Sequence, residues 1–209
     1  PLSYYRSVAQ QALRSTHHLP VPALWRPPLN THLERLSKVF GAGLTVVPFQ
    51  SSSLLGGGML QDFAARALSD ETGQIHLTDT IANPSPPAEV TEAVQSYQKQ
   101  LYPDGKPVFR NDVLKLERRL CEIAKRERLG TKAHLKQDIA DTLLAANRDI
   151  LFALRNDWGV EFDSIDYDLL IDRPYHQQHL QITRFSEICD VDPDQLERMM
   201  MLLSRDLLS

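Results

Sequence analysis

The sequence predicts a mainly α-helical protein, with a bundle-like C-terminal part and a small α+β, βαβ-like element near residues 44–80. Two patterns favour helices: apolar residues recur every three or four positions in most segments, and residues that cap helices precede several of these segments. Composition is the third observation, because 42% of the 209 residues are hydrophobic and 24% are charged. Such a chain buries enough apolar surface to fold, which excludes disorder of the whole chain.

The first segments combine a helix with a proline-rich strap. Ser3 is suited to cap a helix that ends near Ser15. Residues 19–29, LPVPALWRPPL, contain four prolines, and each proline restricts its own φ angle and the residue before it. We therefore expect an extended strap that Trp25 anchors to the core.

A helix and the βαβ-like element follow the strap. Thr31 and Glu34 have the spacing of a capping box, which predicts a helix that begins at Thr31 and ends at Gly41. Strand-like and helix-like patterns then alternate along the chain. The expected elements are a strand over 44–49, a loop over 50–58, a helix over 59–68 and a second strand over 74–80.

The segment 82–88, ANPSPPA, is the clearest boundary in the sequence. Its three prolines among small residues interrupt both helices and strands. We therefore divide the chain into an N-terminal α+β unit with the Pro-rich strap over 1–81, a Pro-rich linker over 82–88 and a helical domain over 89–209.

The helical domain is expected to consist of helices and one exposed strand. Asn111 and Gly130 are suited to begin and end one helix, and Asp192 is suited to cap the last. The expected elements are helices over 90–101, 111–129, 131–157, 174–188 and 193–207, a turn over 102–107 and an exposed strand over 160–172. In the last helix we expect one buried apolar face, made of Leu196, Met199, Met200, Leu203 and Leu207.

Charge is distributed unevenly along the chain. Residues 1–137 carry 17 basic and 12 acidic side chains, whereas residues 138–209 carry 6 basic and 15 acidic ones. On the helix that follows Asn111, four basic residues fall within about 100° of one another and form a candidate surface for nucleic acid or a protein partner. These residues are Lys115, Arg118, Arg119 and Arg126. The alternative is internal pairing, either with Glu122 or with the acidic C-terminal part.

A glycine-rich loop before the helix over 59–68 is a candidate phosphate site. Its residues are Ser53, Gly56, Gly57 and Gly58. Backbone N–H groups and the dipole at a helix N-terminus attract anions, and serine hydroxyls add donors. The Walker A pattern and the dinucleotide-binding glycine spacing are both absent from the sequence. An enzyme that binds a phosphate-bearing ligand here is therefore the third of the functions that we consider.

Two acidic clusters match cation sites only in part. The D-x-D-x-D pattern over 190–194 matches the start of a calcium loop, but Gln195 replaces the glycine and Met201 replaces the glutamate. We interpret Asp192 as a helix cap instead. The other cluster fits an exposed strand edge; its members are Asp163, Asp166, Asp168 and Asp172. No metal and no cofactor are therefore expected.

The remaining features fit a cytoplasmic protein. The two cysteines, Cys121 and Cys189, are too few for a disulfide framework. No apolar run reaches the roughly 18 residues that cross a membrane, and the N-terminal residues lack the pattern of a secretory signal.

The sequence thus favours a non-enzymatic protein-interaction or scaffold subunit of a larger intracellular assembly. This interpretation is based on the helices, the proline-rich strap, the uneven charge and the missing catalytic motifs. The alternative is a nucleic-acid-binding subunit that uses the basic helix face. We expect a protein partner, with nucleic acid as the alternative, and no contact with a membrane.

Overall fold

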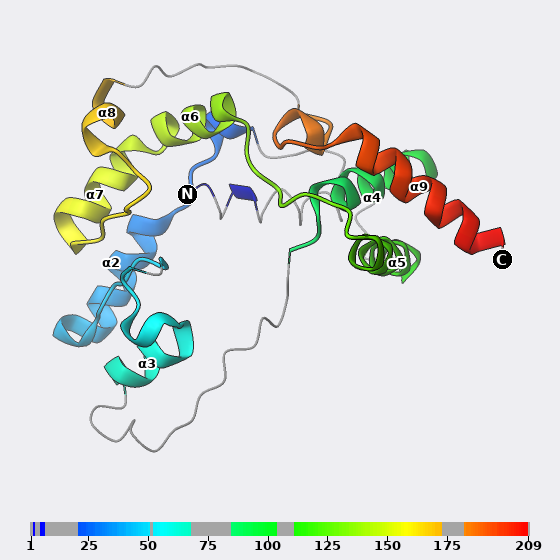
Figure 1. Ribbon diagram of the computed structural model, residues 1–209. Helices are drawn as coiled ribbons and strands as arrows, with labels where there is room; N and C mark the ends of the chain where they lie inside the picture. Colours follow the sequence, from blue (N-terminus) through cyan, green and yellow to red (C-terminus); the bar gives the residue numbers. More distant parts are fainter. Residues whose placement is uncertain are drawn as a thin grey trace. The chain divides into compact units, whose positions relative to one another are not determined.

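The computed structural model describes residues 2, 5–6, 21–50, 52–67, 85–103, 111–172 and 182–208. Within these residues the chain is mainly helical and forms no strand, apart from one isolated antiparallel bridge between Leu135 and Cys189 (Figure 1). The predicted helical fold class is therefore confirmed.

Eight α-helices occur among the described residues, and short 3-10 turns connect some of them. The helices are α2 (Leu29–Phe40), α3 (Met59–Ala67), α4 (Ala88–Leu101), α5 (Asn111–Glu127), α6 (Gln137–Ala146), α7 (Arg148–Trp158), α8 (Tyr167–Asp172) and α9 (Pro193–Leu208). The 3-10 turns are η1 (Pro22–Leu24), η2 (Gly41–Gly43), η3 (Leu55–Gly57) and η5 (Phe185–Glu187).

The chain forms two compact units, and each unit is assembled from separate stretches of sequence. Unit 1 takes its described residues from Pro1–Arg26, Ser85–Ala146 and Arg173–Ser209, and unit 2 takes them from Pro27–Pro84 and Asn147–Asp172. The predicted division at 82–88 concerns which pieces fold independently, and it stays a prediction.

Helices α4, α5 and α9 of unit 1 pack pairwise against one another. Their shared core contains Val94 of α4, Leu120 and Ile123 of α5, and Met199 and Leu203 of α9, all of which are buried. These residues recur at helical spacing within each helix, so each helix contributes one apolar face. The three helices therefore form a small bundle around this core.

A second core of unit 1 joins the first residues of the chain to α6 and to the segment before α9. Tyr5 is fully buried among residues that include Leu143 of α6 and Phe185 of η5. Trp25 packs edge-on against Tyr5, with ring centroids 5.4 Å apart. The prediction that Trp25 anchors the strap is therefore confirmed.

One side of α4 is polar and yet buried. The Glu89 carboxylate accepts hydrogen bonds from the Thr131 N–H at 2.8 Å and from the Asp192 N–H at 3.0 Å. Gln95, two turns further on, accepts from the Phe185 N–H at 2.8 Å. Buried polar groups need such partners, so α4 fixes two connecting segments of unit 1 through side-chain hydrogen bonds.

In unit 2, α2 packs against α7. Helix α8 follows α7 in the chain. Phe152 of α7 packs edge-on against Tyr167 of α8, and Arg155 lies over the same Tyr167 ring at 4.8 Å from its centroid. Gln50 donates a hydrogen bond to Asp163 at 3.1 Å, and this contact ties the segment before α3 to the segment before α8.

The predicted βαβ-like element near residues 44–80 is wrong. Residues 44–48 form no regular secondary structure and pair with no strand among the described residues. Pro48 also lacks the N–H group that a strand pairing would need. The helix of this element is present as α3, whereas the predicted strand over 74–80 lies outside the described residues.

The predicted capping box is also wrong, because α2 begins two residues before Thr31. Pro28 occupies the N-cap position, and no side chain caps the helix. Leu2, Tyr5 and Arg6 are helical, and the rest of the helix predicted to end near Ser15 lies outside the described residues.

The predicted helix over 131–157 is divided. The backbone of residues 134–136 pairs with that of residues 188–190, where the Lys136 N–H donates to Ile188 O at 2.9 Å and the Asp190 N–H to His134 O at 3.0 Å. Helix α6 therefore starts only at Gln137, and a non-helical Asn147 separates it from α7.

The exposed strand predicted over 160–172 is wrong, because α8 occupies its second half. The Asp166 carboxylate accepts hydrogen bonds from the N–H groups of Asp168 and Leu169, as an N-cap does. Of the predicted helix over 174–188, the described residues 182–188 contain only the 3-10 turn η5.

Candidate partner-binding groove

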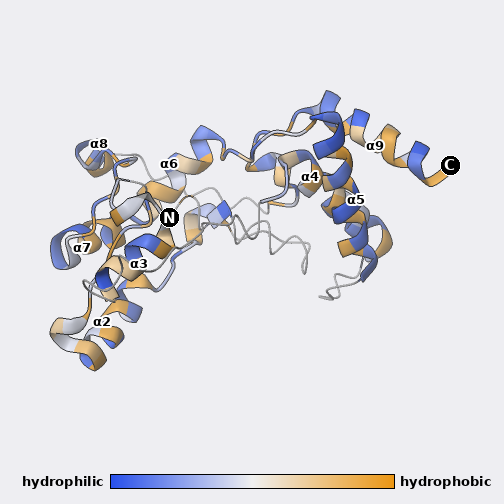
Figure 2. Ribbon diagram, turned by 60° about the horizontal axis from the view of Figure 1, so that its bottom comes forward, coloured by the Kyte–Doolittle hydropathy of each residue, from blue (hydrophilic) through white to orange (hydrophobic). Residues whose placement is uncertain are grey.

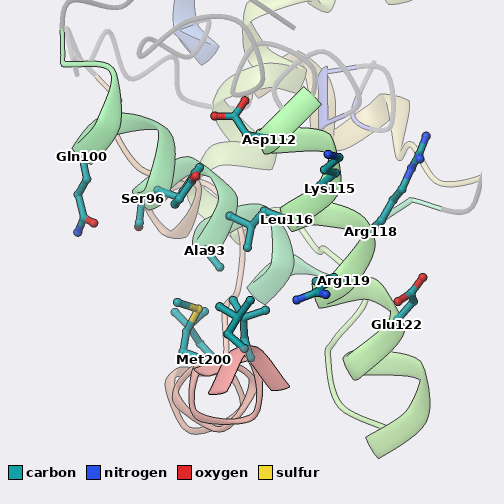
Figure 3. A pocket seen from close by; sticks show the side chains of 14 residues that line it. Ala93, Ser96, Gln100, Asp112, Lys115, Leu116, Arg118, Arg119, Glu122 and Met200 are labelled. Carbon is teal, nitrogen blue, oxygen red and sulfur yellow. The ribbon is translucent and has the colours of Figure 1, made fainter. Parts of the chain in front are cut away.

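A groove of about 840 Å³ lies between α4, α5 and α9 of unit 1 (Figure 3). Each of the three helices contributes one wall, and each wall has residues at the three- and four-residue spacing of one helix face. The lining residues are Ala93, Ser96, Tyr97, Gln100, Asp112, Lys115, Leu116, Arg118, Arg119, Glu122, Leu196, Met200, Leu203 and Leu207.

The wall from α9 is an apolar stripe, which we call the α9 stripe: Leu196, Met200, Leu203 and Leu207. Its 4-3-4 spacing is that of the a and d positions of a coiled coil. Leu203 is 6% exposed, whereas Met200 is 42% exposed and Leu207 is 63% exposed. The prediction that this face is wholly buried is therefore wrong at Met200 and Leu207. Figure 2 shows that apolar residues continue along α9 to its C-terminal end.

The wall from α5 is mixed, with Leu116 beside charged side chains. Figure 3 shows the Arg119 side chain reaching into the groove toward α9, whereas Arg118 and Glu122 point away from it. Lys115, Arg118 and Arg119 are exposed. Among the described residues, none of these three cations forms an ion pair. Three of the four predicted basic residues thus line the groove together with apolar side chains, and they have no acidic partner among the described residues.

Arg126, the fourth residue of the predicted stripe, does not line the groove. Its guanidinium donates to Glu127 at 3.0 Å and to Asp206 of α9 at 3.2 Å. Hydrogen bonds to these two carboxylates raise the pKa of Arg126. Internal pairing with the acidic C-terminal part, the alternative that the sequence left open, therefore occurs at this position.

The wall from α4 consists of small and polar residues together with Tyr97. Asp112 of α5 also lines the groove, and its carboxylate accepts a hydrogen bond from the Tyr102 hydroxyl. Asp112 is therefore engaged within unit 1, and its charge is partly satisfied there.

The glycine-rich loop of unit 2 has its own internal anion. The Leu55 N–H donates to the Asp62 carboxylate at 2.9 Å, and Arg66 donates to the same oxygen at 2.8 Å. These two contacts hold the pKa of Asp62 below its ordinary value. Arg66 also donates to the carbonyl oxygen of Ser53 at 3.2 Å. The Asp62 carboxylate therefore engages the N–H of Leu55, which lies in the same loop as the predicted phosphate-site residues.

The other residues of this loop are placed around the start of α3. Gly56 has φ = +72°, a left-handed conformation that suits glycine, and Gly57 and Gly58 lie between it and Met59. Phosphate binding at Ser53, Gly56, Gly57 and Gly58 stays a prediction.

Aspartates of both acidic clusters accept hydrogen bonds within the protein. Asp192 accepts hydrogen bonds from the N–H groups of Asp194 at 3.0 Å and Gln195 at 3.2 Å, so its predicted role as the cap of α9 is confirmed. A hydrogen bond from the Gln195 side chain, together with these two backbone bonds, lowers the pKa of Asp192. Asp163 accepts from Gln50 and from the Ser52 hydroxyl. In the part of the chain that the structure describes, no cluster of ligand residues suits a metal ion.

Sequence reasoning missed the groove as a site, although it found both of the amphipathic helices that form its mixed and apolar walls. The available signal was the 4-3-4 spacing of the α9 stripe, a pattern that a buried face and a docking face share. It also missed the buried polar side of α4. Glu89, Glu92 and Gln95 are spaced three residues apart, which places them on one face of the helix.

Comparison of the chain with protein-family models, curated proteins and solved structures gave no match. Among the described residues, no helix is both long enough and apolar enough to cross a bilayer. The proposals below are therefore based on the geometry and charge of the groove alone.

Proposed function

We propose that this chain is a protein-interaction subunit of a larger assembly and that it binds its partner in the groove of α4, α5 and α9. The observation that carries the proposal is the α9 stripe, in which the apolar side chains of Met200 and Leu207 are exposed beside the groove. Exposed apolar surface beside polar residues is typical of interaction sites.

A nucleic acid is the second candidate, because Lys115, Arg118 and Arg119 are exposed cations on one helix. Two features favour a protein. The groove places Met200 and Leu207 beside these cations, and apolar side chains offer no hydrogen bond to a phosphate backbone. Tyr97 is the single aromatic side chain among the described residues of the lining, whereas binding of single strands uses several stacking side chains.

Substitution of Met200 provides the test, because Met201 is a matched control. Both methionines are exposed, at 42% and 60%, but only Met200 lines the groove. We expect Met200→Arg to weaken partner binding by about tenfold or more, since it places a charge in the buried centre of the interface. Met201→Arg is expected to leave binding unchanged.

The measurement is quantitative mass spectrometry of the proteins that co-purify with each variant, after circular dichroism has established equal folding. Proteins retained by the wild type and by Met201→Arg but lost from Met200→Arg support the proposal. Identical sets of proteins in all three samples contradict it. Salt-sensitive binding of duplex or single-stranded nucleic acid that is lost in Arg118→Glu/Arg119→Glu contradicts it as well.

A further inference from the structure

We infer that the occupant of the groove is an amphipathic helix of the partner protein, with acidic residues on the side that faces α5. This inference rests on the proposed function and specifies the secondary structure and the charge of the bound segment. It is derived from the shape of the three walls, the length of the α9 stripe and the three cations of α5 in the groove lining, which form no ion pair among the described residues.

The shape of the groove fits a helix. All three walls are helix faces, and in the described residues no strand offers an edge to which an extended peptide could pair. Among the described residues, only α4, α5 and α9 line the groove, and no fourth helix covers their common apolar seam as one does in a four-helix bundle. Recognition of an apolar helix face in a groove between helices is a recurring mode of peptide binding.

The length of the α9 stripe sets the length of the occupant. Leu196 and Leu207 are the ends of this stripe, and at 1.5 Å per residue they lie about 16 Å apart along α9. A partner helix of about three turns covers this distance. Apolar residues at positions i, i+3 or i+4, and i+7 of that helix would contact Met200 and Leu207, which are the exposed members of the stripe.

The charges of α5 select an acidic partner. Arg119 reaches into the groove, and Lys115 and Arg118 lie on the same helix without an ion pair among the described residues (Figure 3). Of the two carboxylates in the lining, Asp112 is hydrogen-bonded to Tyr102, and Glu122 points away from the groove. Opposite charges across an interface favour the correct partner and accelerate its association, so acidic residues are expected next to Arg119.

A peptide library tests both parts of the inference. Peptides of 16 residues, the length of α9, are displayed with an apolar stripe at helical spacing and with flanking positions randomised among acidic, basic and neutral residues. The full chain is the immobilised target. We expect enrichment of acidic flanks, and binding of the selected peptides should weaken as salt is added.

Charge reversal provides the decisive variants. For a selected acidic peptide, Arg119→Glu should weaken binding by about tenfold, and Met200→Arg should abolish it. Lys125→Glu is the matched control, because Lys125 is an exposed cation of α5 outside the groove. The bound peptide should gain helical circular dichroism.

The outcomes separate this inference from the proposed function. Enrichment of basic flanks, selection of peptides that stay non-helical, or no enrichment contradicts the helix inference, even where Met200→Arg still releases a natural partner. Concentration-dependent dimers that Met200→Arg abolishes would mean that a second copy of the chain covers the groove, and they overturn the inference. A Met200→Arg variant that keeps all natural partners overturns the proposed function itself.

Discussion

Arg119 and Arg126 lie two helical turns apart on α5, and their surroundings give them different roles. Arg126 bridges α5 to α9 through Asp206, so its charge stabilises unit 1. Arg119 has no ion pair among the described residues and reaches into the groove. An exposed cation beside an apolar surface is available to a partner, whereas a paired cation must first break its contact.

The two cysteines also differ in their surroundings, because one is buried and the other is partly exposed, and we expect them to differ in reactivity. Cys189 is fully buried in the core that includes Tyr5, and burial raises the pKa of its thiol to about 12. Cys121 is only half-buried. Because the thiolate is the reactive form, we expect a thiol reagent at about pH 8 to modify Cys121 and to leave Cys189 unmodified in the folded protein.

A chromogenic disulfide reagent releases one coloured thiol for each cysteine that it modifies, and absorbance measures this release. The native protein should release one equivalent of reagent thiol per chain, and the unfolded protein should release a second. Cys121→Ser serves as the control and should remove the native reaction. Equal rates for the two thiols in the folded chain would contradict the buried position of Cys189.

At the scale of elements, the ends of helices in unit 1 are held by contacts from distant segments. The Gly130 N–H donates to the Gln195 side chain at 2.5 Å, and Thr131 donates to Glu89. Arg128 has φ = +55°, and the Leu129 N–H bonds to Ala124 O at 2.8 Å, the arrangement of a Schellman motif at the end of α5. The segment after α5 is therefore fixed by α4 and α9 together.

Gly130 gives the sharpest prediction at this scale. A Cβ atom there would lie 2.6 Å from Cβ of Pro87, and the residue has φ = +95°. Gly130→Ala should therefore lower the free energy of unfolding by about 2–4 kcal/mol, because both the clash and the backbone conformation are unfavourable.

Gly159→Ala is the matched control for this substitution. Gly159 also has a positive φ, +64°, but apart from its two chain neighbours no described residue has an atom within 4 Å of its added Cβ. Its cost should be limited to about 1–2 kcal/mol of backbone strain. Urea unfolding curves measure both values, and equal losses in the two variants would show that Pro87 does not restrict Gly130.

At the scale of the whole molecule, unit 1 depends on residues from the beginning, the middle and the end of the chain. Arg6 donates to Ala133 O at 2.7 Å, across 127 positions of sequence. Tyr5 and Trp25 pack in the same core as Phe185 and Ile188. Unit 1 therefore needs its first segment as well as the segments that follow the proline-rich boundary.

Deletion of residues 1–26 tests this dependence. The deletion removes Tyr5, which is fully buried, and Trp25, which packs against it, so we expect a loss of about 3 kcal/mol or more in the free energy of unfolding. Leu24→Ala is the control, because Leu24 is 59% exposed and should change stability by less than about 0.5 kcal/mol. A deletion variant that unfolds with the same midpoint as the full chain would show that the remaining segments form this core alone.

The sequence by itself determined the helical character of the chain and the elements with strong periodicity. Helices α3, α4, α5 and α9 lie where apolar spacing predicts them, and Asp192 caps α9 as expected. These features depend on residues within a few positions of one another, which is why a local pattern is sufficient to predict them.

Tertiary structure alone decided which predicted elements are shortened and which predicted binding residues form contacts within the protein. The backbone pairing between 134–136 and 188–190 makes α6 begin later than the apolar periodicity predicts. Arg126, predicted to bind a partner with the other basic residues, instead forms an ion pair with Asp206. The spacing of the α9 stripe is the same for a buried face and for a docking face. Only the packing of α4 and α5 covers Leu203 and leaves Met200 and Leu207 exposed, because burial depends on segments that are distant in sequence.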